Sequence, residues 1–463
     1  MTETEAPSAF GTSPTLGPSP QTTPTPARER GWRSLLASTE LDTRLLGMVV
    51  ALAAIWITFN ILSDGDFLTS RNLWNLSVQS TSIAIMATGM VLIIVSRNID
   101  LSVGSLLGFL GYTMALVQTD GVIAFFGLKV TIGGLADKPY VWVVALLVGV
   151  VFGALIGSLM GYIVAYGGVP SFIVTLGGFL VWRGMIFRTG GKQGQTLAPL
   201  DHIFQLIGGG AKGSLGEWRS WGFALLGCAG VVLSIYLARR RRSRYDLAVR
   251  PILVDVGLGI VGCAAVIAGV GLIANRYDSP ITGKPTGVAY PVVILIGVTL
   301  LMTYLAKRRR FGRYVYAYGG NPEAAELSGI NTRRTVMLTF SLMGVLVAVS
   351  AAIQTARLNA AVTNLGVQNE LDVIAAAVIG GTSFSGGIGT IPGAVLGAIV
   401  MQSLRSGMVL LRIDSPSQDI VVGVVLVAAV AVDSALRAGR RRAALGALVI
   451  GLALAAIVIQ TGR

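Results

Sequence analysis

Few side chains in this sequence could carry out a catalytic reaction. The single histidine, His202, stands in a long polar segment, where a solvated surface residue is the simplest interpretation. No HExxH pair, CxxC pair or strand–helix GxSxG elbow is present. The glycines around Lys192 (GGKQGQT) do not form a Walker A loop, because the first glycine is missing and Gln193 replaces Ser or Thr. We therefore expect no enzyme, no metal and no cofactor site, and any ATP must be bound by a separate subunit.

Two stretches of small polar residues interrupt apolar segments instead: SRNIDLSVGS (96–105) and GGTSFSGGIGT (380–390). Non-helical backbone at membrane depth occurs only where protein buries it or a water-filled cavity borders it. Broken segments at matching places in two halves are typical of a translocation path. The shared pattern IDLSVG and SFSGGIG suggests an internal repeat, whereas two ordinary glycine-rich turns are the alternative. The predicted path residues are Asp100, Ser102, Gly104, Ser383, Ser385 and Gly387, although Asp100 could instead cap the following helix.

The elements that hold these breaks are membrane spans. The chain of 463 residues is 53% hydrophobic and 13% charged, with a mean hydropathy of +0.72. Apolar runs of about 17 to 25 residues, long enough to cross a bilayer, recur along most of it. This pattern predicts an all-α, polytopic integral membrane protein in contact with lipid. About thirteen spans are expected, at approximately 45–62, 75–95, 101–118, 141–166, 171–187, 221–238, 252–274, 291–306, 336–354, 371–381, 392–411, 420–435 and 443–459.

Segment 371–381 is too short to cross alone, so we interpret it as a broken or partly re-entrant segment that still changes sides. Gly153, Gly157 and Gly161 repeat at every fourth position, which favours close helix packing without further function. Arg183 and Arg405 are the deepest charges, and each either lines an aqueous path or extends toward an interface. These few charges make an ion-coupled carrier the weaker hypothesis.

The net charge of +14 reflects topology and not a nucleic-acid site. Arginines gather in short segments between spans, at 239–244, 307–313, 333–334 and 437–442. By the positive-inside rule these segments are cytoplasmic, which places the N-terminus inside. Residues 1–40 are rich in Pro, Thr and Ser and predict a disordered cytoplasmic tail.

The segment YAYGGNPEAAELSGIN (316–331) predicts a short helix in a cytoplasmic loop, 307–335. Asn321 is a good N-cap, Pro322 suits the first helical position, Glu323 complements the helix dipole, and Gly329 supplies a stop. About two turns are too few to be stable alone in water, so this helix needs a partner surface. The residues assigned to it are Gly320, Asn321, Pro322, Glu323, Ala324, Ala325, Leu327, Ser328 and Gly329. Ala324, Leu327 and Ser328 form its predicted docking face, and a solvated connector is the alternative.

Five motifs resemble the ribose/xylose-type sugar permeases of ABC importers: NIDLSVGS, GVPSFIVTLGG with RG five residues on, YAYGGNPEAAELSGIN, ELDVIAAAVIGGTSFSGGIGTIPGAVLGA and QDIVVGVVLVAAV. They occur in that family's order and cover about 67–433. The resemblance implies a homodimeric all-helical pore in the cell membrane. It also implies a cytoplasmic ABC ATPase that docks on the helix at 322–328, and an extracytoplasmic sugar-binding protein.

The resemblance also sets the domain boundaries. Residues 41–436 form the permease domain, with about ten core spans. An inserted hairpin at 221–275 and a further span within 437–463, after a basic loop, depart from the shorter ribose-type pattern. This lengthened form is more like xylose permeases and favours a pentose such as xylose or ribose. A stand-alone secondary carrier is the alternative function, as is an ABC permease for a branched-chain amino acid or another small polar solute.

Overall fold

The computed structural model describes residues 43–125, 128–189, 196–210, 213–245, 247, 249–279 and 283–437. Four sequence-based expectations lie outside these residues: the disordered tail at 1–40, the segment around Lys192, the basic segment at 437–442 beyond Arg437, and the last span at 443–459.

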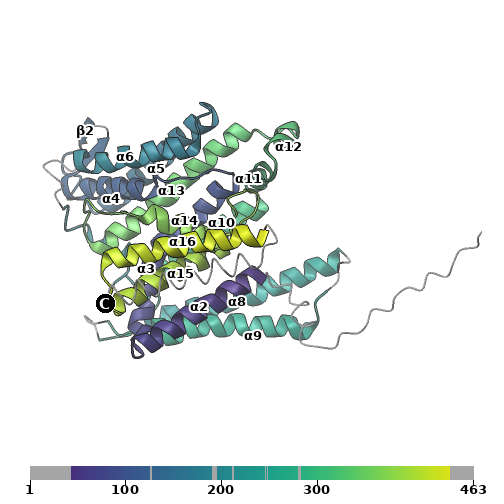
Figure 1. Cartoon of the computed structure of the whole chain (residues 1–463). Coiled ribbons are helices and arrows are strands. Elements are labelled where there is room, and N and C mark those ends of the chain that lie inside the picture. Colours follow the sequence, from purple (N-terminus) through teal and green to yellow (C-terminus); the bar gives the residue numbers. More distant parts are fainter. Residues whose placement is uncertain are drawn as a thin grey trace, which may run out of the picture. The chain divides into compact units, whose positions relative to one another are not determined.

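These residues are almost entirely helical, as the sequence predicts (Figure 1). The helices and strands are α2 (Thr43–Leu62), η1 (Asp66–Leu68), α3 (Ser70–Val95), α4 (Val103–Asp120), β1 (Val122–Phe125), β2 (Leu128–Thr131), α5 (Val141–Ala165), α6 (Ser171–Thr189), α7 (His202–Ile207), α8 (Gly216–Arg244), α9 (Ile252–Ala268), η2 (Gly269–Ala274), α10 (Tyr290–Arg308), α11 (Arg310–Gly320), α12 (Pro322–Leu327), α13 (Thr332–Leu358), α14 (Asn369–Ile379), α15 (Ile391–Leu410) and α16 (Ser415–Arg437).

Nine helices within the described residues are long and apolar enough to cross a membrane. They include the two helices of the expected hairpin, α8 and α9, and α9 continues into the π-helical turn η2. The chain is therefore a multi-pass membrane protein. Three short elements escaped the sequence analysis: the antiparallel hairpin of β1 and β2, the single-turn helix α7, and the amphipathic helix α11 just before α12.

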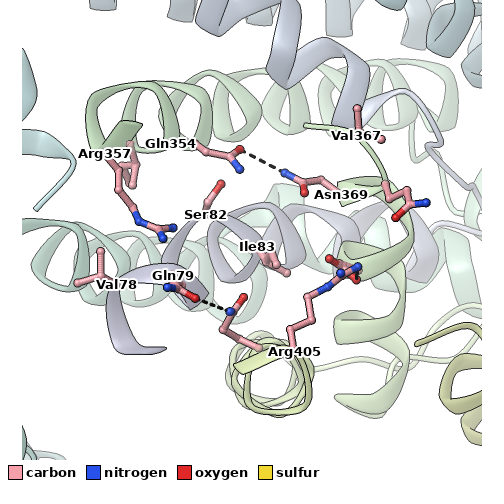
Figure 2. A pocket seen from close by; sticks show the side chains of 13 residues that line it. Val78, Gln79, Ser82, Ile83, Gln354, Arg357, Val367, Asn369 and Arg405 are labelled. Carbon is pink, nitrogen blue, oxygen red and sulfur yellow. Dashed lines mark hydrogen bonds and ion pairs between the residues drawn. The ribbon is translucent and has the colours of Figure 1, made fainter. Parts of the chain in front are cut away.

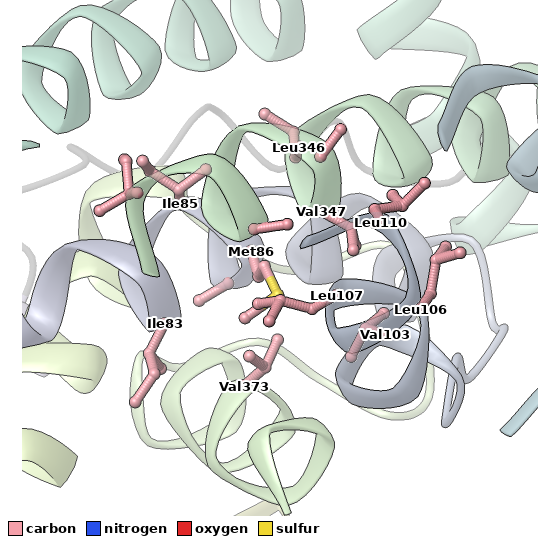
Figure 3. Close-up of a cluster of buried hydrophobic side chains, with 14 of the residues drawn as sticks. Ile83, Ile85, Met86, Val103, Leu106, Leu107, Leu110, Leu346, Val347 and Val373 are labelled. Carbon is pink, nitrogen blue, oxygen red and sulfur yellow. The ribbon is translucent and has the colours of Figure 1, made fainter. Parts of the chain in front are cut away.

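The core is built on α3, α4 and α13, whose facing side chains are buried. Figure 3 shows Met86 of α3 and Leu107 of α4 beside Val347 of α13 and Val373 of α14. Helix α5 packs so closely on α13 that a Cβ at Gly153 would collide with the carbonyl of Gly344. The predicted glycine ladder is thus confirmed as a packing surface, and close approach lets the two backbones gain dispersion contacts in lipid.

Helix α14 has only 11 residues, and the stretch before it, 359–368, is not helical. Gly366 of this stretch lies against Gly104 of α4, and Leu365 and Gly366 are buried, so this part of the stretch packs inside the helical bundle. Its carbonyls need donors there. The Arg183 side chain donates to the carbonyls of Thr363 and Leu365, at 3.3 and 3.4 Å. The predicted broken segment is confirmed, and its break includes the residues before α14.

Candidate functional site

The two polar breaks of the sequence lie side by side. The amide of Gly387, in the second break, donates to the carbonyl of Val95 at the end of α3, at 3.0 Å. Arg97, in the first break, donates from Nε to the carbonyl of Gly319 at 2.7 Å and from Nη2 to that of Gly320 at 2.9 Å. We call this cluster the Arg97 latch. It joins both breaks to the end of α11, directly before α12.

Tight packing and one further hydrogen bond hold the latch together. A Cβ at Gly319 would overlap the Val95 carbonyl, and one at Gly386 would meet the Arg97 side chain, so only glycine fits at both positions. The Tyr316 hydroxyl of α11 donates to the carbonyl of Gly389 at 2.7 Å. Burial raises the pKa of Tyr316 to about 12, so its hydroxyl remains a neutral donor at physiological pH.

The predicted path residues of the first break face the protein interior. Asp100 and Ser102 are buried, and the Asp100 carboxylate accepts from the Ser102 amide at 2.9 Å and from its hydroxyl at 2.6 Å. Asp100 therefore has a structural role in the turn before α4, but it does not cap that helix as the alternative supposed, because the N-cap residue is Ser102. Gly104 is covered by Gly366 and by the side chain of Glu370.

In the second break, Ser383 is buried, Ser385 is exposed and Gly387 is half-buried. The Ser383 and Ser385 hydroxyls share a hydrogen bond of 2.6 Å. The structure thus brings these residues beside the first break and next to α12. That they line a translocation path stays a prediction.

Helix α12 has the ends that its sequence predicts. The Asn321 side chain accepts from the Ala324 amide at 3.1 Å, and Gly329 adopts the left-handed conformation with φ of 77°. Ala325 is buried against the protein, whereas Ala324 is exposed and Leu327 is 91% exposed. A leucine exposed to this degree on a six-residue helix leaves an apolar contact available to another protein.

A second site, which the sequence analysis did not find, is a polar cavity of about 250 Å³ between α3, α13, α14 and α15 (Figure 2). Gln402 lies near the middle of α15, about 16 Å from its first residue at 1.5 Å per residue, so the cavity lies at membrane depth. Its lining consists of Val78, Gln79, Ser82, Ile83, Ile353, Gln354, Arg357, Val367, Gln368, Asn369, Asp372, Gln402 and Arg405.

Amide and hydroxyl groups of this cavity come from distant parts of the chain. The Gln402 side-chain nitrogen donates to Gln79 Oε1 at 2.8 Å, and that of Asn369 donates to Gln354 Oε1 at 3.2 Å (Figure 2). The Ser82 hydroxyl is buried and has no hydrogen-bond partner among the residues that the structure describes. Such a group favours occupancy by a molecule that can hydrogen-bond, because a buried unsatisfied hydroxyl costs free energy. Glutamines inside predicted spans were the available signal in the sequence.

The charges of the cavity are mostly paired. Arg405 Nη2 lies 2.9 Å from Asp372 Oδ1, and Arg405 Nη1 lies 3.5 Å from Asp419 Oδ1. The Asp372 side chain is only 4% exposed, whereas that of Arg405 is 22% exposed, and both line the cavity. The sequence left open whether Arg405 lines an aqueous path or extends toward a membrane interface. In the structure Arg405 lines the polar cavity. His202, in contrast, is exposed near Asp201.

Apolar helices around a polar cavity, together with a short exposed helix outside the spans, are the arrangement of a polytopic membrane permease. A family model described as "Branched-chain amino acid transport system / permease component" matches residues 72–430, more than half of the chain. The chain belongs to this permease family.

Named relatives cover most of the chain. The xylose transport system permease protein XylH of Haemophilus influenzae is 37% identical over 84% of this chain and 95% of its own length. XylH of Escherichia coli K12 is 37% identical over 86% of this chain and 93% of its own. The ribose import permease protein RbsC of E. coli K12 is 32% identical over 83% of this chain and 92% of its own length. No solved structure matches the chain.

Proposed function

We propose that this chain is the membrane-spanning permease subunit of an ABC importer that carries a pentose such as xylose or ribose. The names of the relatives support a pentose. The observation that carries the proposal on structural grounds is the cavity of amides and a hydroxyl at membrane depth. A sugar hydroxyl both donates and accepts, as a glutamine amide does, so sugar hydroxyls match the amide-lined part of the cavity wall.

The cavity also suits a neutral solute. Arg405 is compensated by Asp372 and Asp419, so this pair does not require a charged substrate. The aliphatic side chains of Val78 and Ile83 offer surface for the C–H faces of a sugar ring. A branched-chain amino acid, the solute in the family description, would present a carboxylate and an ammonium group. Arg357 of the lining offers a partner for the carboxylate, but the one carboxylate of the lining, Asp372, already pairs with Arg405, so the ammonium group would lack a partner.

Import requires coupling to ATP, and α12 is the element that fits this role. We propose that the exposed face at Ala324 and Leu327 docks on a cytoplasmic ABC ATPase, and that Ala325 anchors the helix to the permease. The Arg97 latch then passes the movement of α12 to the ends of α3 and of the second break. ATP is bound and hydrolysed by the ATPase, and this chain performs no chemical reaction.

The remaining partners follow from the same proposal. The permease acts as a homodimer in the cell membrane, with its N-terminus in the cytoplasm because the arginine-rich segments lie on that side. A sugar-binding protein delivers the solute from the opposite face. The expected tail, hairpin and last span have no assigned role in transport.

The substrate is tested with the complete complex of permease dimer, ATPase and binding protein, reconstituted in lipid nanodiscs. ATPase activity is measured with xylose, ribose, arabinose, glucose, galactose and leucine. We expect stimulation by at least one pentose and none by leucine. Stimulation by leucine alone would assign the chain to amino-acid transport and contradict the proposal.

A further inference from the structure

The hairpin of α8 and α9 meets the rest of the helical bundle at the end away from its arginine-rich segment. There η2 packs on α3, and the Ser70 hydroxyl of α3 donates to the carbonyl of Leu272 in η2 at 2.8 Å. Beside this contact lies a cavity of about 370 Å³, which we call the hairpin cavity. Residues of α3, α8, α9, η2 and α10 line it, among them Phe223, Val266 and Val292. The transport proposal makes no use of this cavity.

The wall of the hairpin cavity, in the part of the chain that the structure describes, offers no free hydrogen-bonding side chain. Only Trp74 and Ser77 among its lining residues have polar side-chain atoms. Trp74 Nε1 donates to the carbonyl of Gly287 at 2.9 Å, and the Ser77 hydroxyl donates to the carbonyl of Trp74 at 2.7 Å. Water in a cavity needs several polar partners, so a cavity with this wall does not attract water. The occupant that fits it is apolar.

The position of the hairpin cavity indicates where such an occupant comes from. Gly227, in its lining, lies about 16 Å along α8 from the first residue at 1.5 Å per residue, well inside a helix of spanning length. Two other lining residues, Ala265 of α9 and Ile296 of α10, are exposed, so the cavity is open to the protein surface. Around spanning helices that surface faces the hydrocarbon core of the bilayer. The molecules that can enter from there are lipids.

We propose that the hairpin cavity holds an acyl chain of a membrane phospholipid. Acyl chains are flexible, consist of methylene groups and surround the helices at this depth, so one of them can fill the cavity from the side. An empty cavity would leave its lining side chains without dispersion contacts on one side, and a chain inside it restores those contacts. The lipid thereby joins α8 and α9 to α3 and α10. The inference is independent of which solute the permease carries.

Photo-cross-linking tests the proposal with the full-length permease in a bilayer that contains phosphatidylglycerol with a diazirine in one acyl chain. We expect cross-links on Phe223, Val266 and Val292 of the wild-type protein, located by mass spectrometry. Gly269→Leu places a side chain in the cavity, because Gly269 lines it, has a helical backbone (φ −59°, ψ −43°) and has no atom within 4 Å of an added Cβ. This variant should lose those cross-links.

Gly257→Leu is the matched control, since it is the same substitution on α9, also with open space around the added Cβ, but outside the lining. It should retain the cross-links. Ala265→Phe, at the opening of the cavity, is a second blocking variant and should lose them as well. Retention of the cross-links in either blocking variant, or equal loss in the control, would overturn the proposal. Wild-type protein that is cross-linked only elsewhere would overturn it too, because another segment or a second copy of the chain then covers the cavity.

Discussion

Removal of the Arg97 guanidinium should uncouple ATP hydrolysis from transport. The bond from Arg97 Nε to the Gly319 carbonyl is partly buried, and the bond from Nη2 to Gly320 is exposed. A partly buried hydrogen bond from a charged donor contributes about 1.5–3 kcal/mol, and an exposed one contributes less. Arg97→Ala should therefore weaken the link between α12 and α3 by about 2 kcal/mol, which corresponds to roughly a 30-fold change in the equilibrium that couples them.

The assay compares sugar uptake with ATP hydrolysis in proteoliposomes that contain the complete complex. We expect Arg97→Ala to retain its ATPase and its basal hydrolysis, because Leu327 and Ala324 are untouched, while the sugar imported per ATP falls about tenfold or more. Arg97 has a left-handed backbone with φ of 60°, so the control Arg97→Gly removes the side chain and relieves backbone strain. The glycine variant should be uncoupled equally. An unchanged ratio of uptake to hydrolysis in both variants would refute the latch.

Three further substitutions test the docking face of α12, the Asp372–Arg405 ion pair and the polar cavity. Leu327→Glu places a charge in the docking face and should reduce ATPase recovery in a pull-down about 100-fold, while dimer assembly is unchanged; full recovery would make α12 a simple connector. Asp372→Ala leaves Arg405 with only its longer contact to the half-buried Asp419 and should destabilise the permease by about 1–3 kcal/mol, seen as a lower midpoint of thermal unfolding. The double variant with Arg405→Leu should regain most of that loss, and failure to do so would assign the loss to packing. Gln402→Leu unpairs the Gln79 amide and should raise the KM for sugar uptake about tenfold; an unchanged KM would remove this cavity from the path.

Much of the fold follows from the sequence because lipid imposes simple rules on it. Length and hydropathy predict the spans, and the ends of α12 follow from the cap at Asn321 and the stop at Gly329. The broken segment before α15 follows from the short apolar run and the glycine-rich stretch after it. The extent of the non-helical part could not be predicted from the sequence. It depends on Arg183, which is distant in the chain and donates to the carbonyls of Thr363 and Leu365.

The candidate sites depend on contacts between distant residues and so escape sequence reasoning. Gln79 and Gln402 are 323 positions apart and meet only because α3 packs on α15. The latch likewise depends on the left-handed conformation of Arg97, which directs its side chain toward Gly319 and Gly320. The small polar residues correctly predicted that both stretches are not helical. They could not show that the Asp100 carboxylate accepts a hydrogen bond from the Ser102 amide.

Whether the permease imports sugar only with ATP hydrolysis is measured by the dependence of uptake on the ATPase. Radiolabelled xylose and ribose are supplied with the binding protein outside proteoliposomes that contain the permease with ATP inside, either with the ATPase or without it. We expect uptake against a gradient only when both ATPase and ATP are present, and no uptake by the permease alone. Saturable uptake by the permease alone, at a rate that the ATPase does not change, would identify a stand-alone carrier and contradict ATP-driven import.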